Sequence, residues 1–226
     1  MLGAYKLLCA RLRRLRIAEY IITMIKNIIF DLGGVLVDWN PVGELRRMGL
    51  PEEEVNVIVK HTAHSQEWNE IDRGAEDKDA LYNKMIENTP EQYRVDAARF
   101  LKEGVFNAIH SFSYSALWLK SLKERGLSVY LLTNYSDWMF DYHYKNEFSF
   151  TDYVDGMVVS GKVKLLKPER AIYECLMNKY NLKPEECVFF DDRLENVEGA
   201  KKCGINAIVF TDYETARTKL NSYLEI

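Results

Sequence analysis

The chain has 226 residues, enough for one large or two modest domains, and 47% of them are hydrophobic, which is ample for a packed core. Its formal net charge is −4, so the composition gives no general attraction to polyanions, and we expect no nucleic acid as a partner. The cysteines, Cys9, Cys175, Cys187 and Cys203, are far apart. This spacing excludes a disulfide-dense secreted scaffold and a paired-cysteine zinc site, and indicates reduced thiols in a cytoplasmic protein.

Residues 1–23 form a predicted N-terminal extension that is first basic and then briefly apolar. Glu19 interrupts the apolar run, which is shorter than the roughly 20 residues needed to span a bilayer. The continuous apolar stretch and small-residue cleavage site of a signal peptide are not found here. Met24 directly precedes the first strand, so we interpret the segment as an extension from an upstream start and expect no membrane partner. A basic amphipathic surface anchor is the alternative.

The first predicted strand lies in IKNIIFDLGGVLVDWN, an apolar run from Ile25 that ends at Asp31 and two glycines. Residues 41–111 mix charged and apolar positions, as in PEEEVNVIVKHTAH and DKDALYNKMIENTP, and predict an inserted block of helices. The rest alternates between predicted helices and strands: YSALWLKSLKERGL, SVYLLTN, DGMVVSG, PERAIYECLMNKYN, CVFFDD, NVEGAKKCG and NAIVF. This order predicts an α/β fold with a doubly wound parallel-sheet (Rossmann-like) core of residues 24–40 and 112–226.

Polar residues follow three of the predicted strands. Asp31 follows IIF, Thr133 and Asn134 follow LL, and Asp191 and Asp192 follow FF. Because the carboxyl ends of parallel strands lie at one edge of a sheet, we expect these groups to converge in a single crevice. Clustered carboxylates repel one another unless a cation neutralises them, and their hard oxygen ligands suit magnesium. The pattern therefore predicts a Mg²⁺ site.

Three further side chains suit a phosphoryl group. Thr133 and Asn134 offer a hydroxyl and an amide that can hold a phosphoryl oxygen without adding charge. Lys167, which precedes Pro168 at a predicted helix start, can offset the negative charge of a carboxylate and a phosphate. Taken singly, these residues also fit loop caps or a solvated surface charge, but together they favour a phosphate site.

Four segments in this order, FDLGGVLVD, LLTN, LKPE and FFDDRLEN, resemble the four motifs of the haloacid dehalogenase-like (HAD) superfamily. The resemblance covers residues 26–210, and the helices at 41–111 are similar to the cap domain that many members insert after the first motif. Within the superfamily, the similarity is greatest to sugar-phosphatase-like proteins with a glycine in the first motif. The resemblance implies a Mg²⁺-dependent hydrolase of phosphate monoesters that acts on a small phosphorylated metabolite, with a sugar phosphate favoured.

The resemblance also implies a role for each motif residue. Asp31 would attack phosphorus and form a transient aspartyl phosphate, while Thr133 and Lys167 would orient and neutralise the phosphoryl group. Covalent capture divides the displacement into two steps, and the metal reduces the repulsion between the attacking carboxylate and the phosphate. The implied metal ligands are Asp31, the backbone carbonyl of Gly33, Asp191 and Asp192, with Asn196 bracing the acidic loop.

Gly33 departs from the common pattern of the superfamily, in which this position carries an aspartate that serves as general acid and base. General acid–base catalysis contributes about 10²–10⁴-fold, so we expect slow turnover or a substrate whose leaving oxygen needs little protonation, such as a sugar esterified at its anomeric carbon. Candidate substitutes from the cap are His61, His64, Asp72 and Arg73.

The segment EWNEIDRGAEDKDAL resembles the cap stretch that faces the active site in relatives. Asp72 and Arg73, beside a turn at Gly74, are therefore candidate substrate-binding residues. Trp39 and Trp68 are candidates to flank a sugar ring.

Three other functions stay open. Gly33 also fits a catalytically weak or inactive binding or regulatory protein, although the nucleophile, hydroxyl, lysine and acidic pair argue against decay. A 2-haloacid dehalogenase would need no metal, which the acidic pair disfavours. A phosphomutase must move protons in both directions, which a glycine at this position does not support. For the favoured function we expect a monomer or a homodimer with a small-molecule phosphate ester as its partner.

Overall fold

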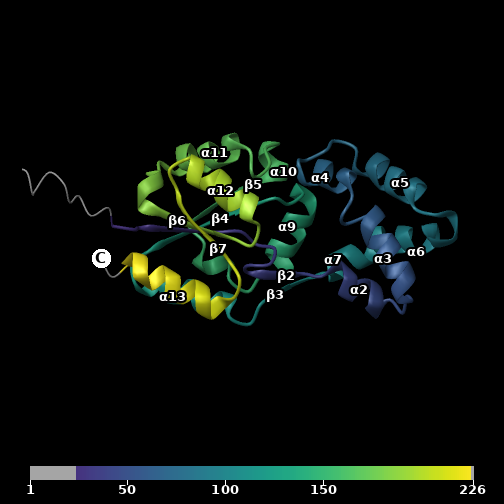
Figure 1. Cartoon of the computed structure of the whole chain (residues 1–226), viewed down its shortest axis with the longest axis horizontal. Helices are drawn as coiled ribbons and strands as arrows, with labels where there is room; N and C mark the ends of the chain where they lie inside the picture. The colour runs from purple at the N-terminus through teal and green to yellow at the C-terminus, as the bar shows by residue number, and fades with distance from the viewer. Residues whose placement is uncertain (1–23, 225–226) are drawn as a thin grey trace, which may run out of the picture.

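A computed structural model describes residues 24–224 and is built around a parallel five-stranded sheet (Figure 1). The strand order is β5-β4-β1-β6-β7, and every neighbouring pair is parallel. The strands are β1 (Asn27–Phe30), β4 (Ser128–Thr133), β5 (Gly156–Val159), β6 (Cys187–Asp191) and β7 (Asn206–Val209). β1 lies at the centre of the sheet, because its apolar residues are buried on both faces.

Helices cover both faces of the sheet. Alternating side chains of β1 point to opposite faces, so Phe30 packs against Trp118 with a ring separation of 4.7 Å, whereas Ile29 joins Tyr173 in a second apolar cluster. The helices of the core are α8 (Ser115–Glu124), α9 (Asp137–Asn146), α10 (Ser160–Val163), α11 (Arg170–Tyr180), α12 (Leu194–Lys202) and α13 (Tyr213–Leu224), with 3₁₀ turns at Thr151–Tyr153 and Pro184–Glu186. The predicted doubly wound α/β core is thus confirmed.

A short antiparallel ribbon joins the core to an inserted helical part. Its two strands are β2 (Val37–Trp39) and β3 (Ile109–Ser111), and the chain between them is helical. The inserted helices are α2 (Pro41–Arg47), α3 (Glu52–His61), α4 (Gln66–Asp72), α5 (Lys78–Asn88), α6 (Arg94–Arg99) and α7 (Val105–Asn107), with a 3₁₀ turn at Glu91–Tyr93 and a π-helical turn at Phe100–Gly104. These helices lie beyond the carboxyl end of β1 (Figure 1). We call this part the cap, and its extent of 41–111 stays a prediction.

Several elements were not foreseen from the sequence. The ribbon strands β2 and β3 have three residues each, too short for a periodic pattern to identify them. α9 and α13 have mixed aromatic and charged sequences whose apolar face is set by packing on the sheet. The predicted extension, residues 1–23, lies outside the described residues. Among residues 24–224, no helix combines the length and the apolar character needed to cross a bilayer.

Candidate active site

Three adjacent strands bring the predicted acidic and hydroxyl groups to one edge of the sheet. β4 and β6 flank β1, with Phe30 in register with Leu131 on one side and with Phe190 on the other. The backbone N–H of Asp31 continues the ladder by donating to the carbonyl of Phe190 at 2.9 Å. Asp31, Thr133 and Asp191 therefore stand at the same carboxyl edge, as the strand pattern predicted.

Asp31, Asp191 and Asp192 form a cluster in which one carboxylate oxygen of each lies within 4.8 Å of the others. Asp31 and Asp191 are buried, whereas Asp192 is exposed. Burial, opposed by the charge of Lys167 and reinforced by Asp191 and Asp192, raises the pKa of Asp31 from 3.8 to about 7. Such a concentration of hard oxygen ligands fits a divalent cation of the magnesium class.

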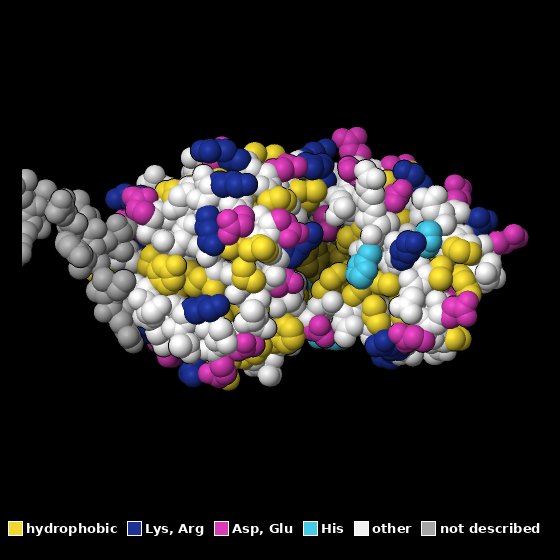
Figure 2. All heavy atoms as spheres, viewed as in Figure 1, with side chains coloured by type: hydrophobic (Ala, Val, Ile, Leu, Met, Phe, Trp, Pro, Cys, Tyr) yellow, Lys and Arg dark blue, Asp and Glu magenta, His cyan; other side chains and the backbone are white. Residues whose placement is uncertain are grey.

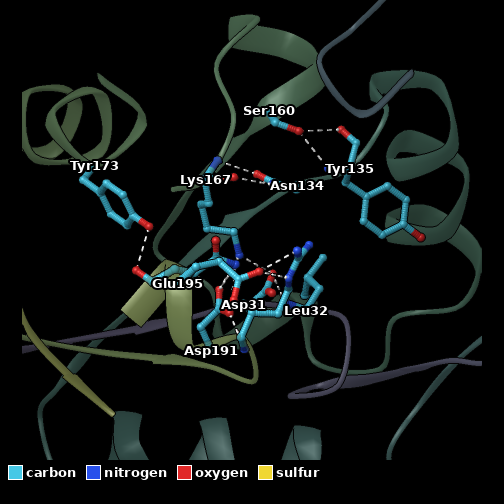
Figure 3. A network of polar contacts seen from close by, with 11 residues as sticks. Asp31, Leu32, Asn134, Tyr135, Ser160, Lys167, Tyr173, Asp191 and Glu195 are labelled. Carbon is cyan, nitrogen blue, oxygen red and sulfur yellow. Dashed lines mark hydrogen bonds and ion pairs between the residues drawn. The ribbon is translucent and has the colours of Figure 1, made fainter. Parts of the chain in front are cut away.

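Lys167 lies between two of these carboxylates (Figure 3). Its Nζ is 2.8 Å from Oδ1 of Asp31 and 2.7 Å from Oδ2 of Asp191, and its side chain is fully buried. Burial alone would lower the pKa of Lys167, but the charges of Asp191 and Asp31 outweigh it and raise the pKa. Lys167 therefore stays a cation and reduces the repulsion between two buried anions.

Asp191, the last residue of β6, and Asp192, which follows it, have different surroundings. Asp191 accepts hydrogen bonds at Oδ1 from the backbone N–H of Arg193 and the amide of Asn196, both at 2.9 Å, and binds Lys167 through Oδ2. Its oxygens are thus held by the protein. The exposed Asp192 has the freer carboxylate of the pair. Asn196 holds Asp191 directly, the contact expected of a residue that braces the acidic loop.

Gly34 allows Asp192 to approach the first loop. Its φ of +70° is a conformation that residues with a side chain rarely adopt, and a Cβ at this position would lie 2.6 Å from Oδ2 of Asp192. Gly33 differs, since a Cβ there would meet only the Cβ of Trp39, at an ordinary 3.9 Å. The second glycine of the motif is therefore needed for close packing, and the first leaves room for a side chain.

Thr133 ends β4 and Asn134 directly follows it. Thr133 is buried at the carboxyl end of β4, the strand next to β1. Both ends of the Asn134 amide bind the backbone of Lys167: Oδ1 accepts from its N–H at 2.8 Å, and Nδ2 donates to its carbonyl at 3.0 Å. Asn134 thus positions Lys167, and its contact with a substrate stays a prediction.

The two predicted cap residues contact the core. Arg73 forms a two-point ion pair with Glu169, with one nitrogen–oxygen distance of 3.2 Å. The backbone carbonyl of Asp72 accepts a hydrogen bond of 2.5 Å from the hydroxyl of Ser160. The cap is therefore fastened to the core beside the site. The contact of Asp72 and Arg73 with a substrate stays a prediction.

Trp39 and Trp68 do not flank an open space. Their rings stack on one another with centroids 5.5 Å apart, and Trp68 is buried. A sugar ring cannot lie between them in this arrangement, so that expectation was wrong. The pair instead forms an aromatic contact between the ribbon strand β2 and the cap helix α4.

Figure 2 shows hydrophobic side chains around the hollow between cap and core.

Three supporting residues escaped the sequence-based prediction. Gly34 was visible as the second glycine of its motif, but its contact with Asp192 was not. Ser160 binds the N–H of Tyr135 at 2.7 Å as well as the carbonyl of Asp72, and Glu169 pairs with Arg73. An isolated serine and a surface-type glutamate carry no local signal for such long-range contacts.

Comparisons with known proteins agree with this architecture. The family model described as haloacid dehalogenase-like hydrolase matches residues 25–204. The chain is 28% identical to the sesquiterpene phosphatase astK of Aspergillus oryzae, over 84% of this chain and 92% of that protein. It is 24% identical to a D-ribitol-5-phosphate phosphatase of Bacteroides thetaiotaomicron, over 80% of this chain and 89% of the relative. A HAD family enzyme of that bacterium, solved with magnesium and inorganic phosphate, superposes with a TM-score of 0.64 at 22% identity, covering 85% of this chain and 98% of its own.

Proposed function

The chain belongs to the haloacid dehalogenase-like hydrolase family, and on this basis we propose that it is a Mg²⁺-dependent phosphatase that forms an aspartyl phosphate on Asp31. The observation that carries the proposal is the buried cation of Lys167 between Asp31 and Asp191, with the exposed carboxylate of Asp192 beside them. A dehalogenase has no need for three clustered carboxylates, which would repel an anionic haloacid.

Asp31, Lys167 and Thr133 have separate roles in the proposed reaction. The N–H of Leu32 donates to Oδ1 of Asp31 at 2.7 Å, and Lys167 binds the same oxygen, which leaves Oδ2 to attack phosphorus. The hydroxyl of Thr133 donates to a phosphoryl oxygen, and Lys167 offsets the charge that accumulates there. Water then attacks the phosphorus of the aspartyl phosphate and regenerates Asp31.

Asp31, Asp191, Asp192 and the backbone carbonyl of Gly33 would hold Mg²⁺. When bound, Mg²⁺ would neutralise charge on the phosphoryl oxygens and on the carboxylates. Asp191 is fixed by Arg193 and Asn196, so the acidic loop is shaped for the ion before it binds.

The substrate is a small phosphorylated metabolite, and we favour a sugar phosphate. The ribitol-5-phosphate phosphatase among the relatives supports this choice. The sesquiterpene phosphatase among them, together with the hydrophobic side chains around the hollow, favours a second class, the phosphate esters of apolar alcohols. The two classes differ in how much apolar surface they would bury against the cap.

Phosphate release from a panel of sugar, polyol, prenyl and aryl phosphates tests the proposal. Each substrate is measured with Mg²⁺, with EDTA, and with the Asp31→Asn variant, and Asp38→Asn serves as a matched control on β2. We expect Mg²⁺-dependent release that is lost in Asp31→Asn and kept in Asp38→Asn. Release that survives both EDTA and Asp31→Asn would contradict the proposal, and silence across the panel would favour a binding or regulatory protein.

A further inference from the structure

Asp72 ends the cap helix α4 and is held against the core on two sides. Its carboxylate accepts a hydrogen bond from the backbone N–H of Ser136, and its carbonyl accepts one from the hydroxyl of Ser160. Gly74 follows with a φ of +85°, and a Cβ there would collide with the carbonyl of Gly161. Asp72 and Gly74 therefore lie directly on α10, and the carboxylate of Asp72 reaches the loop that follows β4.

The carboxyl of Asp72 lies among the charged groups of the site. The charges of Asp31, Lys167 and Arg193 in the core act on this carboxyl. The charge of Asp72 in turn acts on the hydroxyls of Tyr82 in the cap and Tyr135 in the core. Burial is the largest influence and, with the charge of Asp31, raises the pKa of Asp72 to about 7, although the N–H of Ser136 acts in the opposite direction.

A residue next to this carboxyl has a buried hydroxyl without a hydrogen-bond partner among the described residues. The hydroxyl of Ser136 is buried and has no hydrogen-bond partner within residues 24–224. Buried polar groups are almost always paired, with protein, water or a ligand. A hydroxyl without a partner beside Asp72 therefore points to a water molecule or a substrate oxygen at this place.

The first loop offers no proton carrier of its own. Gly33 has no side chain, and the space beside it is open apart from Trp39 at 3.9 Å. Of the other cap candidates, His61 is the partly exposed last residue of α3, His64 is exposed, and Arg73 is paired with Glu169. The carboxyl of Asp72 is held by the backbone N–H of Ser136, two residues after Asn134, and the charge of Asp31 acts on it.

We propose that Asp72 is the general acid and base of the reaction, supplied by the cap in place of a carboxyl at position 33. The inference rests on the proposed phosphatase function. In the first step, an oxygen of Asp31 bonds to phosphorus, the ester P–O bond breaks with its electron pair on the alcohol oxygen, and Asp72 gives that oxygen its proton. In the second step, water bonds to phosphorus, its proton passes to Asp72, and the electron pair of the breaking bond returns to the carboxylate of Asp31.

The dependence of rate on the leaving group tests this role. An alkyl phosphate needs a proton on its leaving oxygen, whereas a nitrophenyl phosphate does not. Asp72→Asn should lower kcat/KM, which reports the first step alone, by about 100-fold or more for the alkyl ester and by no more than about threefold for the aryl ester. Glu70→Gln, an exposed carboxylate on the same helix, is the matched control and should leave both rates unchanged.

Two further readouts separate proton transfer from a structural role. In the wild type, kcat/KM for the alkyl ester should fall as pH rises above about 7, because the proton donor of the first step loses its proton, and Asp72→Asn should lack this fall. Gly33→Asp, for which the structure has room, should restore alkyl turnover in Asp72→Asn by about tenfold or more. Thermal unfolding and Mg²⁺ titration of each variant verify folding and metal binding.

Equal losses of kcat/KM on both esters, or no loss on either, would overturn the assignment of proton transfer to Asp72. A wild-type protein that hydrolyses neither ester in Mg²⁺ would overturn the proposed phosphatase function, and this inference with it. The two failures are distinguishable, because the first leaves the wild-type aryl activity and its loss in Asp31→Asn intact.

Discussion

Replacing Gly34 by alanine should damage the metal site far more than it damages the fold. The φ of +70° costs a residue with a side chain about 1–2 kcal/mol, and the new Cβ would lie 2.6 Å from Oδ2 and 2.9 Å from Cγ of Asp192. The carboxylate is the mobile end of its side chain, so it should move away instead of unfolding the loop. Displacing a group that shapes a metal site typically costs about 10–100-fold in affinity. Isothermal titration of the metal-free variant with Mg²⁺ measures this loss.

Gly126→Ala is the matched control for this prediction. Gly126 has a φ of +78°, and a Cβ there would have no heavy atom within 4 Å. The two variants should therefore lose similar stability through backbone strain, while only Gly34→Ala loses Mg²⁺ affinity. The reasoning would be refuted if Gly34→Ala bound Mg²⁺ like the wild type, or if Gly126→Ala weakened binding to the same degree.

Three other perturbations follow from the same geometry. Lys167→Met should abolish turnover and lower the free energy of unfolding by about 3–5 kcal/mol, because it leaves Asp31 and Asp191 buried without their cation; denaturant titration at neutral pH measures the loss, and wild-type stability would contradict it. The raised pKa of Asp31 means that the folded, metal-free protein keeps a proton which the unfolded chain releases between pH 3.8 and about 7, so stability should fall as pH rises through this window. Thermal unfolding in EDTA should show a steeper fall for the wild type than for Asp31→Asn, and equal slopes would count against the raised pKa. Arg73→Ala should change global stability by less than about 1 kcal/mol, because the pair with Glu169 is partly exposed, yet increase hydrogen exchange in α4; unchanged exchange there would show that the pair does not fasten the cap.

The arrangement of the strands was predictable because apolar runs end at polar residues. IIF before Asp31, LL before Thr133 and FF before Asp191 each indicate a buried parallel strand, and the edge at which such strands end is a property of the fold. The family resemblance supplied the roles expected of Asp31 and Lys167.

The supporting contacts were not predictable, because they join residues that are distant in the sequence. The amide of Asn134 fits a phosphoryl oxygen and a peptide backbone equally well, and only the folded chain places the backbone of Lys167 against it. The same holds for Gly34 with Asp192 and for Arg73 with Glu169. Trp39 and Trp68 likewise pack on one another, since burying apolar rings together is favourable without any ligand.

The most direct test of the account is to look for the covalent intermediate itself. Wild-type protein is mixed with Mg²⁺ and a phosphate ester that it hydrolyses, quenched in acid during turnover, and digested for peptide mass spectrometry. The account predicts a phosphorylated aspartate in the peptide that contains Asp31, absent in EDTA and in Asp31→Asn. Steady product formation without an adduct, or an adduct on another residue, would contradict it.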